Sequence, residues 1–324
     1  MKQLSELMGY RESIRVVDAT IRDGGLVNSF RFSDDLVRAL YQANIRAGVD
    51  YMEMGYKASR AIFDENKFGK WKFSKDEDIV EVLGLTGSEK PIKLAVMADV
   101  GRCDYEQDIL PRSESPLDLI RVATYIQQMP EAIHMIEDAK NKGYEVSCNI
   151  MAISAAQEGD VRIALEMLGK SPVDVVYIVD SYGALIPEQV ARIADLYLEM
   201  GEKYGKKIGI HAHNNQQLAF ANTIEAIGDG VDYLDATYAG MGRGAGNCSM
   251  ENLISFLKNP KYDLYTVIDF VEKYMKPLRE SGTVWGYDLQ YLLTGVMNQH
   301  PRSAIAFTES GRTDYTEFYR EIED

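Results

Sequence analysis

The sequence of 324 residues has few cysteines and no long apolar run. Its cysteines are scattered without CxxC spacing, so we expect reduced thiols rather than a disulfide framework; they are Cys103, Cys148 and Cys248. No run reaches the roughly 18 apolar residues of a membrane-spanning helix, and the N-terminal MKQLSELMGYRES lacks the apolar core of a secretory signal. These absences predict a cytoplasmic protein without a membrane segment.

Positive charge is also scarce, because 35 lysines and arginines stand against 50 aspartates and glutamates, giving a net charge of −15. Binding to a nucleic-acid backbone depends largely on neutralising phosphates with basic side chains, so we expect no nucleic-acid partner. A small anionic substrate is not excluded, since a local basic pocket can lie within an acidic protein.

Short β-branched apolar segments alternate with stretches of helical periodicity along most of the chain. Buried strands that alternate with helices are typical of parallel βαβ units, and eight such units over about 240 residues favour a closed (β/α)8 barrel. The expected strands are Ile14–Asp18, Tyr51–Gly55, Ile92–Ala98, Leu119–Thr124, Glu145–Ile150, Val175–Asp180, Ile208–His213 and Tyr233–Thr237.

Helix signals agree with this count. Ser33 is placed to cap a helix that ends at Gly48, and Pro130 and Pro187 each open a further helix. Late in the chain the helical pattern continues without strands. We therefore predict an α/β protein with a TIM-barrel domain at residues 1–258 and a small C-terminal helical extension at residues 259–324 that packs on the barrel.

The connection after the second strand, residues 56–75, is much longer than the roughly 2–6 residues of most βα loops. It combines several aromatic side chains with six basic residues and only two acidic ones. Two interpretations are open. The loop is either an ordinary solvated lid or a cover whose Lys57 or Arg60 contacts a phosphate, a carboxylate or a sugar acid of the substrate.

Polar residues follow three of the predicted strands, at the face where (β/α)8 barrels carry their active sites. Strand one leads into DATIRDGG (18–25), strand seven into HAHNN (211–215) and strand eight into GMGRGAGN (240–247). Residues two apart on a strand point to the same side, so His211 and His213 can grip one ion. Asp23 follows strand one, which adjoins strand eight, and it adds an oxygen ligand near the histidine pair.

Together, DATIRDGG, HAHNN and AGMGRGAGN resemble the HMG-CoA lyase-like (DRE-TIM) metallolyase superfamily, over residues of about 14 to 258. The resemblance implies that Asp23, His211 and His213 are metal ligands and that Asn247 is a fourth. Oxygen and nitrogen donors without a thiolate suit Mn²⁺, which we expect, or Mg²⁺ or Co²⁺. Asn247 has an alternative role as the cap of a helix that begins near Ser249.

The resemblance also implies a catalytic arginine. Arg22 matches the residue that stabilises an enolate oxygen, and its alternative is a structural arginine paired with Asp18 or Glu53. Asp180 and Ser181 end strand six, where we expect them to line the pocket in a substrate-binding or an architectural role.

Two departures favour one branch of the superfamily. Members that cleave HMG-CoA carry a cysteine in the loop after strand eight, where this chain has Met241, Arg243 and Ala245. The synthases carry Glu-Gln after R-D-G, where this chain has Gly25 and Leu26. The short loop and the helical tail are instead similar to the 4-hydroxy-2-oxovalerate aldolase branch.

The general base is the open question of this resemblance. The aldolases place a histidine shortly after R-D-G, whereas this chain has LVN at 26–28 and no ionisable group there. The base must then be Tyr291, His300, a metal-bound hydroxide or the substrate itself. Tyr291 lies in GYDLQY (286–291), which resembles the tail segment that contributes a tyrosine to acid–base chemistry. Packing of that tyrosine over the barrel is its alternative role.

The function that follows is a divalent-metal-dependent carbon–carbon lyase that acts on a small anionic 2-oxo acid such as pyruvate through a metal-bound enolate. A Claisen-type acyl-CoA condensing enzyme and a non-catalytic, metal-stabilised barrel are the alternatives. The resemblance further implies an aldehyde dehydrogenase partner that consumes the released aldehyde, and we also expect a homo-oligomer.

Overall fold

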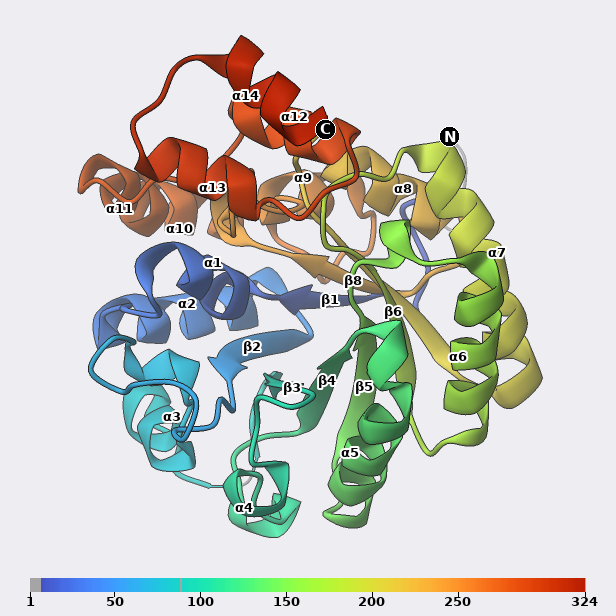
Figure 1. The fold of residues 1–324 in the computed structure, drawn as a ribbon. Helices are drawn as coiled ribbons and strands as arrows, with labels where there is room; N and C mark the ends of the chain where they lie inside the picture. Colours follow the sequence, from blue (N-terminus) through green and yellow to red (C-terminus); the bar gives the residue numbers. More distant parts are fainter. Residues whose placement is uncertain (1–6, 88, 324) are drawn as a thin grey trace.

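A computed structural model of the protein describes residues 7–87 and 89–323, and its eight parallel strands close into a barrel (Figure 1). Each strand pairs with the next along the chain, and β8 pairs with β1. The predicted fold is confirmed, and every predicted strand lies within one residue of its observed bounds. The strands are β1 (Arg15–Asp18), β2 (Tyr51–Tyr56), β3 (Lys93–Asp99), β4 (Leu119–Thr124), β5 (Glu145–Ile150), β6 (Val175–Asp180), β7 (Lys207–Ala212) and β8 (Tyr233–Ala236).

Helices surround the barrel and fill the connections between strands (Figure 1). The Ser33 side chain accepts a hydrogen bond from the Leu36 backbone N–H at 3.3 Å and so caps α2, which ends at Gly48. The helix at Pro187 begins as predicted. The helices are α1 (Thr20–Asn28), α2 (Asp34–Ala47), α3 (Asp76–Leu83), α4 (Tyr105–Asp108), α5 (Met129–Asn141), α6 (Glu158–Lys170), α7 (Pro187–Tyr204), α8 (Ala219–Asp229), α9 (Met250–Phe256), α10 (Leu264–Phe270), α11 (Lys276–Glu280), α12 (Leu289–Val296), α13 (Arg302–Glu309) and α14 (Tyr315–Glu323).

The C-terminal helices pack on the barrel in two ways. Helix α10 lies against α2, and its Val267 and Phe270 belong to the main hydrophobic core. Helices α12, α13 and α14, in red in Figure 1, form a second small apolar cluster around Phe307 and Phe318. The part after residue 258 is therefore helical, although its first helix shares the core of the barrel. The domain boundary at residue 258 stays a prediction.

The remaining expectations concern thiols and membranes. Cys103, Cys148 and Cys248 are buried and free of disulfides. Within residues 7–87 and 89–323, no helix is long and apolar enough to cross a bilayer. Residues 1–6, part of the segment in which we expect no secretory signal, lie outside the described residues.

Charged side chains replace apolar packing in the middle of the barrel. Arg121 on β4 is fully buried, and its guanidinium donates to Glu53 of β2 at 2.9 Å and to Asp235 of β8 at 2.6 Å. The same guanidinium lies 4.5 Å from the ring centroid of Tyr177. Because an unpaired buried charge is costly, this cross-barrel pairing is needed to keep three charges inside, and it supports the site above it.

Candidate metal centre and active site

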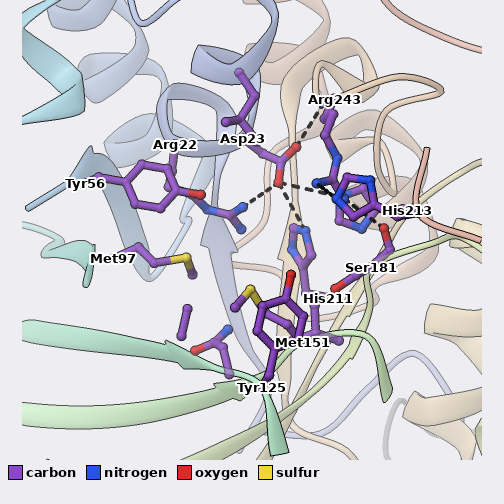
Figure 2. A pocket seen from close by; sticks show the side chains of 15 residues that line it. Arg22, Asp23, Tyr56, Met97, Tyr125, Met151, Ser181, His211, His213 and Arg243 are labelled. Atoms are coloured by element: carbon purple, nitrogen blue, oxygen red, sulfur yellow. Dashed lines mark hydrogen bonds and ion pairs between the residues drawn. The ribbon is translucent and has the colours of Figure 1, made fainter. Parts of the chain in front are cut away.

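Three side chains at the C-terminal end of the barrel come together as the sequence predicts. Asp23 lies in the first turn of α1, His211 on β7 and His213 just beyond that strand, and all three are buried. One ligand atom from each lies within 4.8 Å of the other two. Figure 2 shows the carboxylate of Asp23 facing both imidazoles.

The hydrogen bonds of the two histidines leave their inner nitrogens free for a cation. Nδ1 of His211 lies 2.9 Å from Oδ2 of Asp235, and Nδ1 of His213 lies 3.0 Å from the backbone oxygen of Asp180. These partners are acceptors, so Nδ1 carries the proton and Nε2 presents a lone pair. Both Nε2 atoms are buried and have no hydrogen-bond partner among the described residues. Burial lowers the pKa of His213 to about 4, which keeps the ring neutral near pH 7.

Asn247 lies beside this triad with its side-chain oxygen also buried and without a hydrogen-bond partner in the part of the chain that is described. Its amide donates to the Met241 backbone oxygen at 3.2 Å, which orients the amide group. The alternative role as a helix cap is not supported, because Ser249 caps α9 by accepting from Asn252 N–H at 3.4 Å. Unpartnered buried polar atoms need an explanation, and a divalent ion with oxygen and nitrogen ligands fits these four residues.

Arg22 lines the cavity and is held by two carboxylates. Its Nε donates to Glu53 at 2.9 Å, and its Nη1 contacts Asp23. Asp18, the other partner considered from the sequence, instead accepts from Thr20 and Asn44. Burial alone would raise the pKa of Asp23, but the guanidinium of Arg22 holds it well below its usual range. Pairing with Glu53 therefore fixes Arg22 at the cavity wall.

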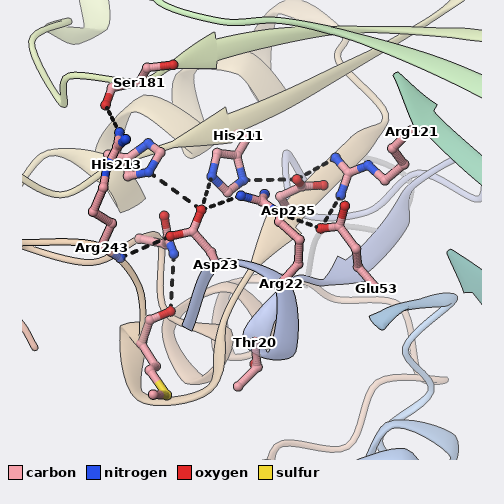
Figure 3. A network of polar contacts seen from close by, with 12 residues as sticks. Thr20, Arg22, Asp23, Glu53, Arg121, Ser181, His211, His213, Asp235 and Arg243 are labelled. Atoms are coloured by element: carbon pink, nitrogen blue, oxygen red, sulfur yellow. Dashed lines mark hydrogen bonds and ion pairs between the residues drawn. The ribbon is translucent and has the colours of Figure 1, made fainter. Parts of the chain in front are cut away.

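These contacts form one connected network (Figure 3). It runs from Asp23 and Arg22 through Glu53 to Arg121, and from Arg121 through Asp235 back to His211. Arg121 and Asp235 could not be identified from the sequence, because only barrel closure brings β4 and β8 to the same interior.

A cavity that opens to solvent adjoins the triad, and the empty space in and above it, open solvent included, is about 520 Å³. It contains Ser181 and His300 as predicted, together with residues that we did not assign from the sequence. Most of these residues lie near or just past the end of a strand, and that position in the sequence could have identified them. They include Tyr56, Met97, Tyr125, Asn149, Met151 and Arg243.

The two residues of the C-terminal segment that we considered as bases have different positions. His300 lines the cavity, with Nε2 3.3 Å from Nη1 of Arg243. Tyr291 does not line it. The Tyr291 ring is buried in the cluster of α12, α13 and α14, and its hydroxyl lies 3.5 Å from that of Thr308. These contacts match the packing role considered for Tyr291, and its role in acid–base chemistry stays a prediction.

Asp180 and Ser181 have different surroundings, and only Ser181 lines the cavity. The Asp180 carboxylate accepts from the backbone N–H groups of Ala184 at 3.0 Å and Leu185 at 3.2 Å, so it shapes the loop after β6. Ser181 lines the cavity, and its backbone oxygen accepts from Arg243 at 2.9 Å.

Lys57 and Arg60 do not reach this cavity, so the structure does not support them as its substrate contacts. Lys57 is buried in an ion pair with Asp76 at 2.6 Å, and the half-exposed Arg60 lies 3.1 Å from Glu65. Both line a separate surface depression. The loop packs inward through aromatic residues such as the fully buried Trp71, which accounts for its length without a substrate contact.

The fold and the site together define a (β/α)8-barrel protein with a buried Asp-His-His centre at the active-site mouth. Residues 13–274 match the family model described as HMGL-like, and the chain belongs to this family. It is therefore an enzyme of a family whose matched relatives are named as lyases.

Two curated relatives illustrate the match. A 4-hydroxy-2-oxovalerate aldolase from Pelotomaculum thermopropionicum is 29% identical over 260 residues, which cover 79% of this chain and 74% of the relative. An oxaloacetate decarboxylase from Mycobacterium tuberculosis is 32% identical over 257 residues, which cover 77% and 71% respectively.

Solved structures agree on the fold. The N-terminal domain of a Bacteroides vulgatus protein assigned as an aldolase is 29% identical, with a TM-score of 0.76, and the match covers 91% of this chain and 96% of that domain. The HMG-CoA lyase from Brucella melitensis has a TM-score of 0.64 at 19% identity, over 83% of this chain and 100% of that chain, and supports the fold alone.

Proposed function

We propose that the protein is a divalent-metal-dependent carbon–carbon lyase of the aldolase type that acts on a 2-oxo acid through its enolate. The observation that carries the proposal is the buried set of Asp23, His211 and His213, whose free Nε2 atoms lie beside Arg22 at one cavity. A bound Mn²⁺, Mg²⁺ or Co²⁺ would act there as a Lewis acid on the 2-oxo acid.

Arg22 has the position to stabilise the charge that develops on the substrate. Its guanidinium is oriented by Glu53 and Asp23, so little reorganisation is required when an enolate oxygen becomes negative. Most of the cavity wall is buried, and low exposure to water strengthens such an interaction.

His300 is the candidate proton acceptor that lines the cavity, whereas the Tyr291 ring packs in the cluster of α12, α13 and α14. Burial, together with the guanidinium groups of Arg243 and Arg302, lowers the pKa of His300 to about 4. The ring is thus neutral and weakly basic in the free protein. An anionic substrate near Arg243 would raise that pKa toward the range in which a general base is effective.

Decarboxylation of a 3-carboxylated 2-oxo acid is a second candidate, favoured by one observation. Leu26, at the place where related aldolases carry a histidine, lines the cavity with an apolar side chain. Loss of CO₂ needs no base, because breaking the carbon–carbon bond leaves its electrons on the enolate directly. The similarity to an oxaloacetate decarboxylase is consistent with this candidate. The acyl-CoA alternative, the homo-oligomer and the dehydrogenase partner stay predictions.

The test is deuterium exchange at C3 of pyruvate in D₂O, followed by NMR with and without Mn²⁺. We expect metal-dependent exchange that Asp23→Asn and His211→Ala abolish, whereas Arg60→Met, outside the cavity, retains it. Absence of exchange in metal-loaded protein would count against the enolate. Release of CO₂ from oxaloacetate above the rate with Mn²⁺ alone would favour the second candidate.

A further inference from the structure

Arg243 stands out among the cavity residues because its charge has no counterion among the residues described. Its Nη2 donates to the Ser181 backbone oxygen at 2.9 Å, its Nη1 lies 3.3 Å from His300, and its Nε is buried without a hydrogen-bond partner. Arg22 and Arg121, by contrast, are each paired with two carboxylates. The cavity therefore holds one positive charge that the protein itself does not neutralise.

The backbone fixes where this charge lies. The N–H of Arg243 donates to Oδ1 of Asp23 at 3.1 Å, and its carbonyl accepts from Gly246 at 3.1 Å. The backbone of Arg243 thus lies next to the triad of Asp23, His211 and His213, and its side chain extends along His213 toward Ser181 (Figure 2). Arg22 approaches Asp23 from the other side, so the triad lies between a neutralised arginine and an unneutralised one.

We propose that Arg243 binds a second carboxylate of the substrate, and that the protein therefore prefers 4-hydroxy-2-oxo dicarboxylates over monocarboxylates. This inference rests on the proposed lyase function and names its substrate class. A guanidinium and a carboxylate form the strong, charge-assisted pair that such a site requires. Ser181 and His300 hold the guanidinium in place at the cavity wall.

The chemistry decides which fragment carries that carboxylate. A guanidinium bound to a carboxylate that must leave as CO₂ would stabilise the ground state and slow decarboxylation. A carboxylate that stays on the released aldehyde meets no such penalty. In 4-hydroxy-2-oxoglutarate, for example, the C3–C4 bond breaks, its electrons form the enolate of pyruvate, and the hydroxyl proton passes to a base. C4 becomes the aldehyde of glyoxylate, and protonation of C3 completes pyruvate.

The experiment runs this reaction in the direction of addition, with pyruvate, Mn²⁺ and one of two acceptors. Both acceptors are small aldehydes; glyoxylate carries a carboxylate where glycolaldehyde carries a hydroxymethyl group. We expect the wild type to favour glyoxylate, and Arg243→Met to lower the ratio of the two kcat/KM values by about tenfold to a hundredfold. Arg243→Lys keeps the charge and should retain part of the preference. Arg60→Met, which removes a charge outside the cavity, should leave the ratio unchanged.

A binding measurement keeps the inference testable if a variant is inactive. Calorimetry with Mn²⁺ compares 2-oxoglutarate with 2-oxovalerate, which have the same chain length and differ in the distal carboxylate. We expect tighter binding of 2-oxoglutarate by the wild type and loss of that difference in Arg243→Met. Thermal unfolding of both Arg243 variants identifies any that fail to fold.

The outcomes separate this inference from the proposed function. If pyruvate shows metal-dependent exchange but the acceptor ratio is the same in the wild type and Arg243→Met, the inference is overturned and the lyase function stands. The inference is also overturned if Arg243→Met lowers kcat/KM for both acceptors and the affinity for both 2-oxo acids by the same factor. Arg243 would then contact the part of the molecule that all these ligands share. If the wild type shows no exchange, the proposed function itself fails and this inference fails with it.

Discussion

The carboxylate of Asp235 accepts a hydrogen bond from Nδ1 of His211 at 2.9 Å through the same oxygen, Oδ2, that accepts from the Arg121 guanidinium at 2.6 Å. The contact to His211 selects the tautomer in which Nε2 faces Asp23, and the contact to Arg121 keeps Asp235 ionised. The orientation of a proposed metal ligand on β7 is therefore tied to a charged group at the centre of the barrel.

Asp235→Asn should weaken metal binding without removing a ligand. The amide is uncharged and holds His211 less firmly in the required tautomer, so we expect an affinity for Mn²⁺ about 10- to 100-fold lower. Titration calorimetry on metal-stripped protein measures it. Asp35→Asn, on the exposed side of α2, is the matched control. Equal Mn²⁺ affinity in Asp235→Asn and the wild type would show that Asp235 does not position the ligand.

Arg121→Met should cost much of the stability of the fold. The substitution preserves an unbranched apolar chain but leaves Glu53 and Asp235 buried with one positive partner fewer each. Breaking a buried ion pair in this way typically costs about 3–5 kcal/mol. Urea unfolding at neutral pH gives the free energy of unfolding. A loss no larger than that of the surface variant Arg60→Met would contradict the central role of Arg121.

Local sequence was sufficient to predict the barrel and the meeting of Asp23, His211 and His213 at its mouth. Short apolar segments such as Val175–Asp180 are recognisable because buried parallel strands need continuous apolar character, and the spacing of His211 and His213 fixes their common direction on β7. To predict that Asp23 lies near the two histidines, only the order of strands in a closed barrel was required. The three residues could therefore be identified because each lies in a short sequence motif that is recognisable without knowledge of distant contacts.

Contacts between distant segments were not predictable in the same way. Lys57 is basic and lies next to a strand end, yet Asp76, which is 19 residues away, neutralises it inside the protein. His300 and Tyr291 are close in the chain, and only the packing of α12 against α13 and α14 turns one toward the cavity and the other away. Arg243 was visible in the glycine-rich loop, but its missing counterion appears only when all surrounding strands are in place.

Asp18 predicts a specific dependence of stability on pH. Burial raises the pKa of Asp18 from its ordinary value of 3.8 to about 6, despite hydrogen bonds from Thr20 and Asn44. The folded protein therefore binds this proton more tightly than the unfolded chain. The resulting stabilisation is complete below about pH 4 and is lost as the pH rises through about 6. By this linkage, the wild type should lose about 3 kcal/mol relative to Asp18→Asn over that range.

Urea unfolding of the wild type and Asp18→Asn at several pH values across this window measures the difference. Asp35→Asn provides the control for a carboxylate at the surface. A difference between wild type and Asp18→Asn that stays constant with pH would show that Asp18 does not titrate in this range in the folded protein.

Gly242→Ala should abolish metal binding while the barrel stays folded. A Cβ at position 242 would lie 2.1 Å from Nδ2 of Asn247 and 2.7 Å from Oδ1 of Asp23, so two proposed ligands must move apart. Gly159, in α6, has no atom within 4 Å of the same added carbon. Gly159→Ala is therefore the matched control, and it should be neutral or stabilise the protein by up to about 1 kcal/mol. Bound metal after dialysis, measured together with thermal unfolding, decides the result: a folded Gly242→Ala protein that still binds Mn²⁺ with wild-type affinity would exclude Asp23 and Asn247 as a joint ligand pair.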